Sequence, residues 1–236
     1  MAAGNSVWDE IREQNKKMKG KPFKEQFQYF WEYYRVPTLV TIFVVVFIIN
    51  LIHTMVTATD NGLGVILVNG YADIDTSQYM IDFEEYVQMD TKEYSTYMEV
   101  NFTVDAENYD EYVMANVQKF SAMVAANQLD VVIGDEDTVL GYAEAGYFHN
   151  LTDILPADVL EAHKDQFIYF DIPDDNVEGE VPVGINISET SLIADSGAYL
   201  ASGGEAYFAV IGNTMNAENV AAFLEYIETV PVLMME

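Results

Sequence analysis

Residues 38–56 read TLVTIFVVVFIINLIHTMV, an apolar run that contains no formally charged side chain. At a helical rise of about 1.5 Å per residue, the run extends roughly 28 Å, close to the ~30 Å hydrocarbon core of a bilayer. We therefore expect a single transmembrane helix here. It divides the chain into a segment 1–37, a linker 57–62 and a domain 63–236.

The charges on the two sides of this run differ strongly. Residues 1–37 carry seven basic and five acidic side chains, whereas the rest of the chain carries three basic and 34 acidic ones. Basic residues close to a membrane span remain cytoplasmic. Phe30, Trp31, Tyr33 and Tyr34 suit the inner headgroup region, where amphipathic rings settle. The sequence thus predicts a cytoplasmic N-terminus, a cell-membrane location and an extracytoplasmic acidic domain.

Two other interpretations of the apolar run remain open. Val56-Thr57-Ala58 resembles the small-residue cleavage site of a signal peptide, although the run is longer than the usual apolar region of such peptides. The run could also be a buried helix of a soluble protein, but its almost complete lack of a polar face makes a membrane span the better interpretation. His53, near its outer end, is either a group that senses protons or contacts a partner, or an ordinary interfacial residue.

The composition of the outer part limits its partners. It has no cysteine, so disulfides cannot stabilise it and a hydrophobic core must do so. Its large negative charge repels phosphate and argues against nucleic-acid binding. The remaining partners are the membrane, a small solute or peptide, cations, and membrane proteins with a basic surface.

Short apolar strands alternate with amphipathic helices in the outer part. Strands are expected at 64–69, 98–104, 130–134, 181–187 and 206–212, and helices at 77–89, 108–127, 138–145, 156–164 and from Asn216 onward. This order predicts an α/β domain with a mainly parallel sheet.

Several local features accompany this pattern. A helix over 9–34 is expected to break at Gly20-Lys21-Pro22, and Asp60-Asn61-Gly62 is expected to form a turn or linker. Ser77 and Asn216 are candidate helix caps, because short polar side chains accept hydrogen bonds from free backbone N–H groups. Gly146 is expected just after the end of a helix.

No enzyme motif stands out, and we do not expect an enzyme. The chain has no nucleophile elbow, no phosphate-binding loop and no paired histidines at metal-ligand spacing. His149 and His163 are expected at the surface. No cofactor is expected other than Ca²⁺, which acidic clusters can bind through oxygen ligands. The clusters are Asp135-Glu136-Asp137 and, as the better candidate, Asp171, Asp174, Asp175, Glu178 and Glu180; the alternative is a solvated loop.

The outer part resembles the extracellular solute-binding proteins of bacterial uptake systems. The matching segments are GVILVN, EVNFTV, AANQLDVVIGD, YAEAGYFHNLTDIL, VPVGINIS and YFAVIGNTMNAENVAAFLEYI. The resemblance implies a reduced solute-binding fold and a ligand site that includes Asp135, Glu136, Asp137 and Tyr142. The chain departs from the family in its length, which suits about one lobe, and in its transmembrane anchor. The basic stretch followed by YFWEYYR and the span is similar to small anchored proteins of Firmicutes.

Two functions follow as expectations. The first is a non-enzymatic, membrane-anchored binding or sensing domain, which predicts a defined pocket. The second is an interaction or scaffold subunit of a membrane complex, which predicts an apolar surface patch and no pocket for a small molecule. A glycan-acting hydrolase would need a carboxylate pair at glycosidase spacing in a cleft.

Overall fold

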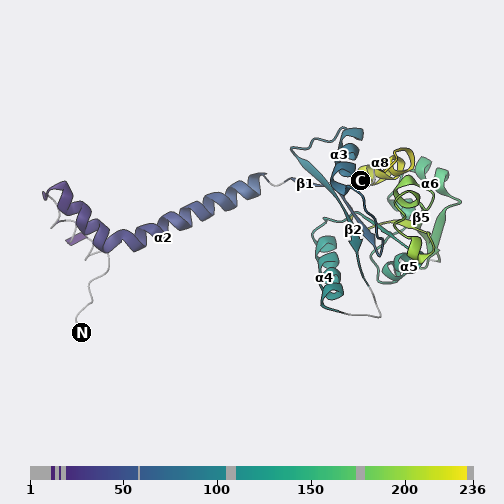
Figure 1. Cartoon of the computed structure of the whole chain (residues 1–236), viewed down its shortest axis with the longest axis horizontal. Coiled ribbons are helices and arrows are strands. Elements are labelled where there is room, and N and C mark those ends of the chain that lie inside the picture. Colours follow the sequence, from purple (N-terminus) through teal and green to yellow (C-terminus); the bar gives the residue numbers. More distant parts are fainter. Residues whose placement is uncertain are drawn as a thin grey trace. The chain divides into compact units, whose positions relative to one another are not determined.

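The computed structural model divides the chain into two compact units, residues 1–58 and residues 59–236 (Figure 1). The described residues are 12–13, 16, 20–57, 59–104, 110–173 and 179–232.

The first unit contains the long helix α2, Phe23–Thr57. Residues 20–22 are not helical, and Gly20 has a φ of +97° in the left-handed region, so the predicted break at Gly20–Pro22 is confirmed. Pro37 lies inside α2 and removes one backbone hydrogen bond, and Figure 1 shows α2 bent along its length. Among the described residues, one helical stretch, Tyr34–Thr54, is long and apolar enough to cross a membrane, and none of its side chains is buried.

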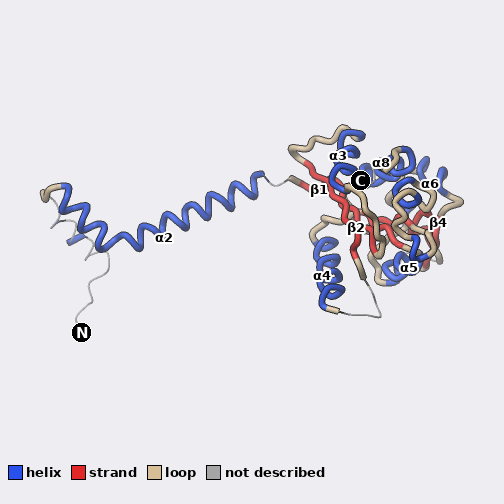
Figure 2. Tube along the Cα trace, viewed as in Figure 1, coloured by secondary structure: helices blue, strands red, loops and turns tan. Residues whose placement is uncertain are grey.

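The second unit contains a six-stranded sheet with helices on both faces (Figure 2). The strands are β1 (Asp60–Val68), β2 (Tyr94–Phe102), β3 (Val131–Gly134), β4 (Phe167–Phe170), β5 (Val181–Asn186) and β6 (Tyr207–Val210). The helices are α3 (Thr76–Tyr86), α4 (Glu111–Ala125), α5 (Glu136–Glu144), α6 (Ala157–His163), α7 (Ser191–Ala194) and α8 (Ala217–Thr229), with short 3₁₀ turns η1 (Leu151–Asp153) and η2 (Leu200–Ser202).

The strand order is β2-β1-β3-β6-β5-β4. Strand β1 pairs in parallel with β2 and with β3, whereas the β3–β6, β6–β5 and β5–β4 pairs are antiparallel. The α/β class is therefore confirmed, but the sheet is mixed and the expected mainly parallel arrangement describes only one half. Parallel neighbours need a crossover, usually a helix. In the other half, the described residues between β4 and β5 contain no helix, and those between β5 and β6 contain only the short helix α7 and the 3₁₀ turn η2.

Alternating side chains of the central strands build a core on each face of the sheet. On one face, Leu63, Val65 and Leu67 of β1 pack in a cluster with buried residues of α3 and α8. On the other face, Ile66 and Val68 belong to a second cluster with residues of α4 and α5. Strand β1 is buried on both sides, as expected for a central parallel strand covered by crossover helices.

Four local predictions were wrong. Asp60–Gly62 is the first part of β1 rather than a turn, and Asn61 pairs with Ser95 of β2. The cap of α3 is Asp75, which accepts a hydrogen bond from Gln78 N, and not Ser77.

The other two concern side chains that are held by distant partners. Asn216 is in the cap position of α8, but its side-chain oxygen accepts no capping hydrogen bond, and its amide nitrogen donates to Asp130. His163 is buried at 7% exposure, with its ring nitrogens bonded to the Val159 carbonyl and the Glu228 carboxylate.

Candidate functional site

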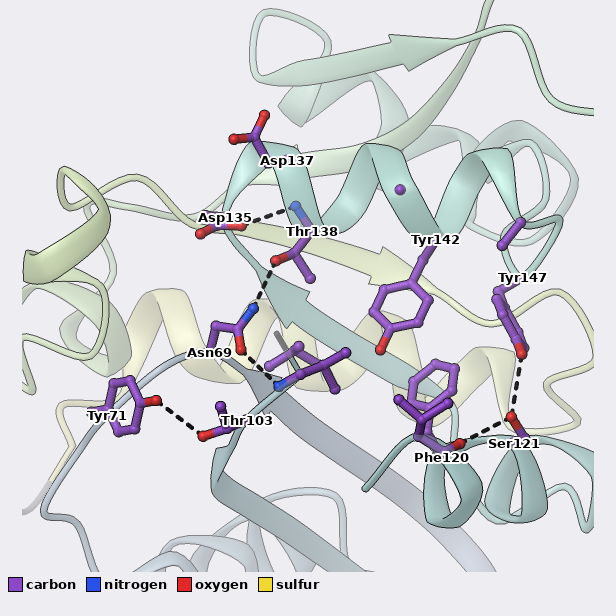
Figure 3. A pocket seen from close by; sticks show the side chains of 15 residues that line it. Asn69, Tyr71, Thr103, Phe120, Ser121, Asp135, Asp137, Thr138, Tyr142 and Tyr147 are labelled. Atoms are coloured by element: carbon purple, nitrogen blue, oxygen red, sulfur yellow. Dashed lines mark hydrogen bonds between the residues drawn. The ribbon is translucent and has the colours of Figure 1, made fainter. Parts of the chain in front are cut away.

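A cavity of about 660 Å³ lies where β1, β2 and β3 end (Figure 3). Its size is within the range of small-molecule pockets. It is lined by Val68, Asn69, Tyr71, Thr103, Val104, Val117, Phe120, Ser121, Asp135, Asp137, Thr138, Gly141, Tyr142, Ala145 and Tyr147.

The topology of the sheet explains why a cavity forms there. From β1 the chain passes through α3 to β2 on one side, and from β2 it passes through α4 to β3 on the other side of β1. Helices α3 and α4 therefore cover opposite faces of the sheet. In open α/β sheets, ligands bind at the carboxyl ends of strands at such a switch in strand order.

Asn69 links the polar side of the cavity. It follows β1 with a φ of +58°, a left-handed conformation that asparagine tolerates. Its side-chain oxygen accepts a hydrogen bond from Val104 N at 2.9 Å, and its amide donates to Thr138 Oγ1 at 3.3 Å. One side chain thus connects the end of β1 to the segment after β2 and to α5, as Figure 3 shows.

Tyr199 joins β1 and β3 next to the cavity. Its hydroxyl contacts the backbone carbonyl oxygens of Val68 at 3.0 Å and Ile133 at 2.8 Å. The ring fits because residue 70 is glycine: a Cβ there would lie 2.7 Å from the Tyr199 ring. Burial, and then the charge of Asp135, raise the pKa of Tyr199 well above its ordinary value, so the hydroxyl remains a donor.

Aromatic rings form the opposite side of the cavity. The rings of Phe120 and Tyr142 stack with centroids 4.5 Å apart, and Tyr147 meets both of them edge-on. Ser121 Oγ and the Tyr147 hydroxyl lie 3.4 Å apart. Phe120 comes from α4 and Tyr142 from α5, so the two helices that cover this face of the sheet meet at this wall.

The beginning of α5 contributes the acidic groups. Asp135 is the cap of the helix, and its Oδ1 accepts a hydrogen bond from Thr138 N at 3.0 Å. Asp137 lies in the first turn, at the rim of the cavity, and Glu136 is exposed but does not line it. The resemblance to solute-binding proteins implied a ligand site at four residues, and three of them, Asp135, Asp137 and Tyr142, line this one cavity.

The structure describes only part of the acidic cluster at 171–180, which was the better candidate for binding Ca²⁺. Asp174, Asp175 and Glu178 lie outside the described residues, and Asp171 and Glu180 are within them. In the described ranges, no group of three or more His, Cys, Asp or Glu side chains is arranged to hold a metal ion. The Asp135-Glu136-Asp137 cluster is within those ranges, and helix capping accounts for Asp135.

Sequence reasoning missed most of the cavity. Asn69, Tyr71, Thr103 and Phe120 were not among its candidates. The rule that ligands bind at the carboxyl ends of strands would have pointed to Asn69 and Thr103, because each lies at or next to the carboxyl end of an expected strand. No feature of the sequence places Tyr199 near the cavity, because it lies in the β5–β6 connection, far from β1 and β3 along the chain.

Comparison with protein-family models, with curated proteins and with solved structures gave no match. The functional argument therefore depends on the geometry of the cavity and the chemistry of its lining.

Proposed function

We propose that the chain is a single-pass membrane protein whose acidic domain lies outside the cytoplasm and binds a small solute without transforming it. The cavity at the carboxyl ends of β1 and β3 carries this proposal, because its size and position are typical of ligand sites in α/β domains. Its mixture of aromatic and polar lining is also typical of such sites.

The lining favours binding over catalysis. Among the described lining residues, the titratable side chains are two aspartates and three tyrosines, without a histidine, lysine or cysteine. Asp135 is engaged as a helix cap, and Asp137 lies at the rim. This set offers hydrogen bonds and an aromatic surface but no nucleophile paired with a base.

The binding proposal is tested by thermal unfolding of the full chain in a non-ionic polyoxyethylene detergent. The solutes are sugars, amino acids, amines, short peptides and Ca²⁺. A ligand that binds only the folded form raises the unfolding midpoint by mass action. We expect a saturable rise with one class of solute. No rise at millimolar concentrations would reject solute binding and favour the scaffold role.

The topology is tested by cysteine labelling, which the chain suits because it has no cysteine of its own. Lys21→Cys and Glu144→Cys place one exposed thiol on each side of the apolar stretch. We expect a membrane-impermeant maleimide to label Glu144→Cys in intact cells and Lys21→Cys only after lysis. The opposite pattern would reverse the orientation.

A further inference from the structure

We propose that the cavity selects an organic cation, an amine or quaternary ammonium compound with an apolar part. This inference rests on the proposed solute binding and specifies the ligand class of the same site. Three properties of the cavity carry it: carboxylates without a basic partner among the described residues, a helix terminus that is already negatively charged, and an aromatic wall.

In the part of the chain that the structure describes, no cation lies opposite the carboxylates of the cavity. Among the described residues, neither Asp135 nor Asp137 forms an ion pair, and no lysine, arginine or histidine lines the cavity. Lys119 of α4 is engaged elsewhere, with its ammonium 2.6 Å from the Glu99 carboxylate. A bound cation would supply the missing positive charge.

The beginning of α5 discriminates against anions. Free N–H groups and the helix dipole make a helix N-terminus favourable for negative ligands. Here the Asp135 carboxylate already occupies the Thr138 N–H, and Glu136 and Asp137 add negative charge in the first turn. A phosphate or carboxylate ligand would meet these like charges at that position.

The aromatic wall matches the other requirement of an organic cation. Tyr142 and Tyr147 are partly exposed and supply apolar contact area, and the buried Phe120 ring packs against both of them. Aromatic faces also attract ammonium groups, especially where water is displaced. The domain as a whole carries 34 acidic and three basic side chains beyond residue 37, which concentrates cations near it.

Matched pairs of ligands test the charge requirement. Choline is compared with 3,3-dimethyl-1-butanol, which has nearly the same shape without the charge, and 2-phenylethylamine is compared with 2-phenylethanol. Titration calorimetry uses the full chain in polyoxyethylene detergent at low salt. We expect at least one cation to bind saturably, with its neutral partner at least about tenfold weaker, and binding to weaken as salt is added.

Matched variants test whether the cavity is the site. Asp135→Asn keeps an oxygen for the helix cap while removing the charge. Asp137→Asn removes the charge at the rim. Glu136→Gln removes one charge from the same helical turn but does not line the cavity. We expect the first two variants to weaken binding of the cation about three- to tenfold, and Glu136→Gln to change it less than twofold.

The outcomes separate the two proposals. Binding of a sugar, peptide or neutral analogue as strongly as the cations would overturn the cation inference and leave solute binding intact. Equal weakening by all three variants would also overturn it, because it would indicate attraction to the general field and not to the cavity. If no solute of any class binds, both proposals fail.

Discussion

Asp130 and Asp135 lie at opposite ends of the short strand β3, and their surroundings differ completely. Asp130 is 1% exposed and accepts hydrogen bonds from Gly64 N, Asn61 Nδ2, Thr214 Oγ1 and Asn216 Nδ2. Asp135 is partly exposed and accepts one bond, from Thr138 N.

The difference separates a structural carboxylate from one available to a ligand. A buried charge is tolerated when hydrogen bonds satisfy its oxygens, and those of Asp130 are occupied by donors from β1 and from the β6–α8 connection. Asp130 therefore connects the amino ends of β1 and β3 to the segment that follows β6. At the carboxyl ends of β1 and β3, the side chains of Asn69 and Tyr199 make the connecting hydrogen bonds. The Asp135 carboxylate is therefore able to accept a further hydrogen bond from a ligand in the cavity.

The largest expected effect is the removal of Asp130. Asp130→Ala leaves the buried Gly64 N–H and the partly buried donors of Thr214 and Asn216 without their acceptor, so we expect a loss of about 3–5 kcal/mol in the free energy of unfolding. Both tryptophans, Trp8 and Trp31, precede the apolar run. Urea unfolding is therefore followed by the near-ultraviolet circular dichroism of the tyrosines.

Asp165→Ala is the control for this variant, because it removes an exposed aspartate from the same domain. It is expected to change the free energy of unfolding by less than about 0.5 kcal/mol. A loss below 1 kcal/mol for Asp130→Ala would contradict the structural role of that carboxylate.

A smaller effect is expected at the other end of the strands. Tyr199→Phe removes the hydroxyl that contacts the carbonyl oxygens of Val68 and Ile133, which should cost about 1–3 kcal/mol. The same urea unfolding measures it. Tyr112→Phe, in an exposed position on α4, is the control and should be nearly neutral. Equal effects of the two variants would show that Tyr199 does not hold β1 to β3.

The contrast between Asp130 and Asp135 also marks the limit of the sequence reasoning. Hydrophobic periodicity placed the central strands and most helices, because each depends on residues a few positions apart. It could not show that Asn61, Gly64, Thr214 and Asn216 converge on Asp130, since those contacts span up to 86 residues. For the same reason Asn216 was expected to cap α8, although its amide is bonded to Asp130.

The sheet illustrates the same limit. The β1-α3-β2 and β2-α4-β3 crossovers follow from alternating strands and long helices, and that half was predicted. Strand β4, which reads FIYF, was missed because four apolar residues show no period. Its pairing with β5, and the position of β6 between β3 and β5, depend on packing across the whole domain.

A pH titration sharpens the comparison, because a tyrosine lies beside each aspartate. Burial, then Asp130 and Glu99, raise the pKa of Tyr97, while burial and Asp135 raise the pKa of Tyr199. The folded state therefore holds these protons above pH 10, where the unfolded chain loses them. Their stabilising contribution is complete below pH 10 and decreases as the pH rises through the folded pKa values.

We expect the free energy of unfolding to fall between pH 9 and pH 11. Tyr97→Phe and Tyr199→Phe should each make that fall shallower, because each removes one group that titrates. Tyr112→Phe should leave the slope unchanged. A slope unaffected by either of the first two variants would mean that other groups govern the alkaline loss; Tyr226, whose pKa burial and Asp82 raise to about 12, would be the next to test.

The smallest expected effect is at Asp135 itself. Asp135→Asn keeps the cap of α5 and should change the free energy of unfolding by less than about 0.5 kcal/mol, whereas Asp135→Ala loses the cap and should cost about 1 kcal/mol. Urea unfolding of both variants and of Asp130→Ala compares how much each of the two carboxylates contributes to the free energy of unfolding. A loss above about 2 kcal/mol for Asp135→Asn would mean that the fold needs its charge, as it needs that of Asp130. A near-neutral result, together with weaker binding of a cation, would leave the Asp135 charge a role at the cavity and none in stability.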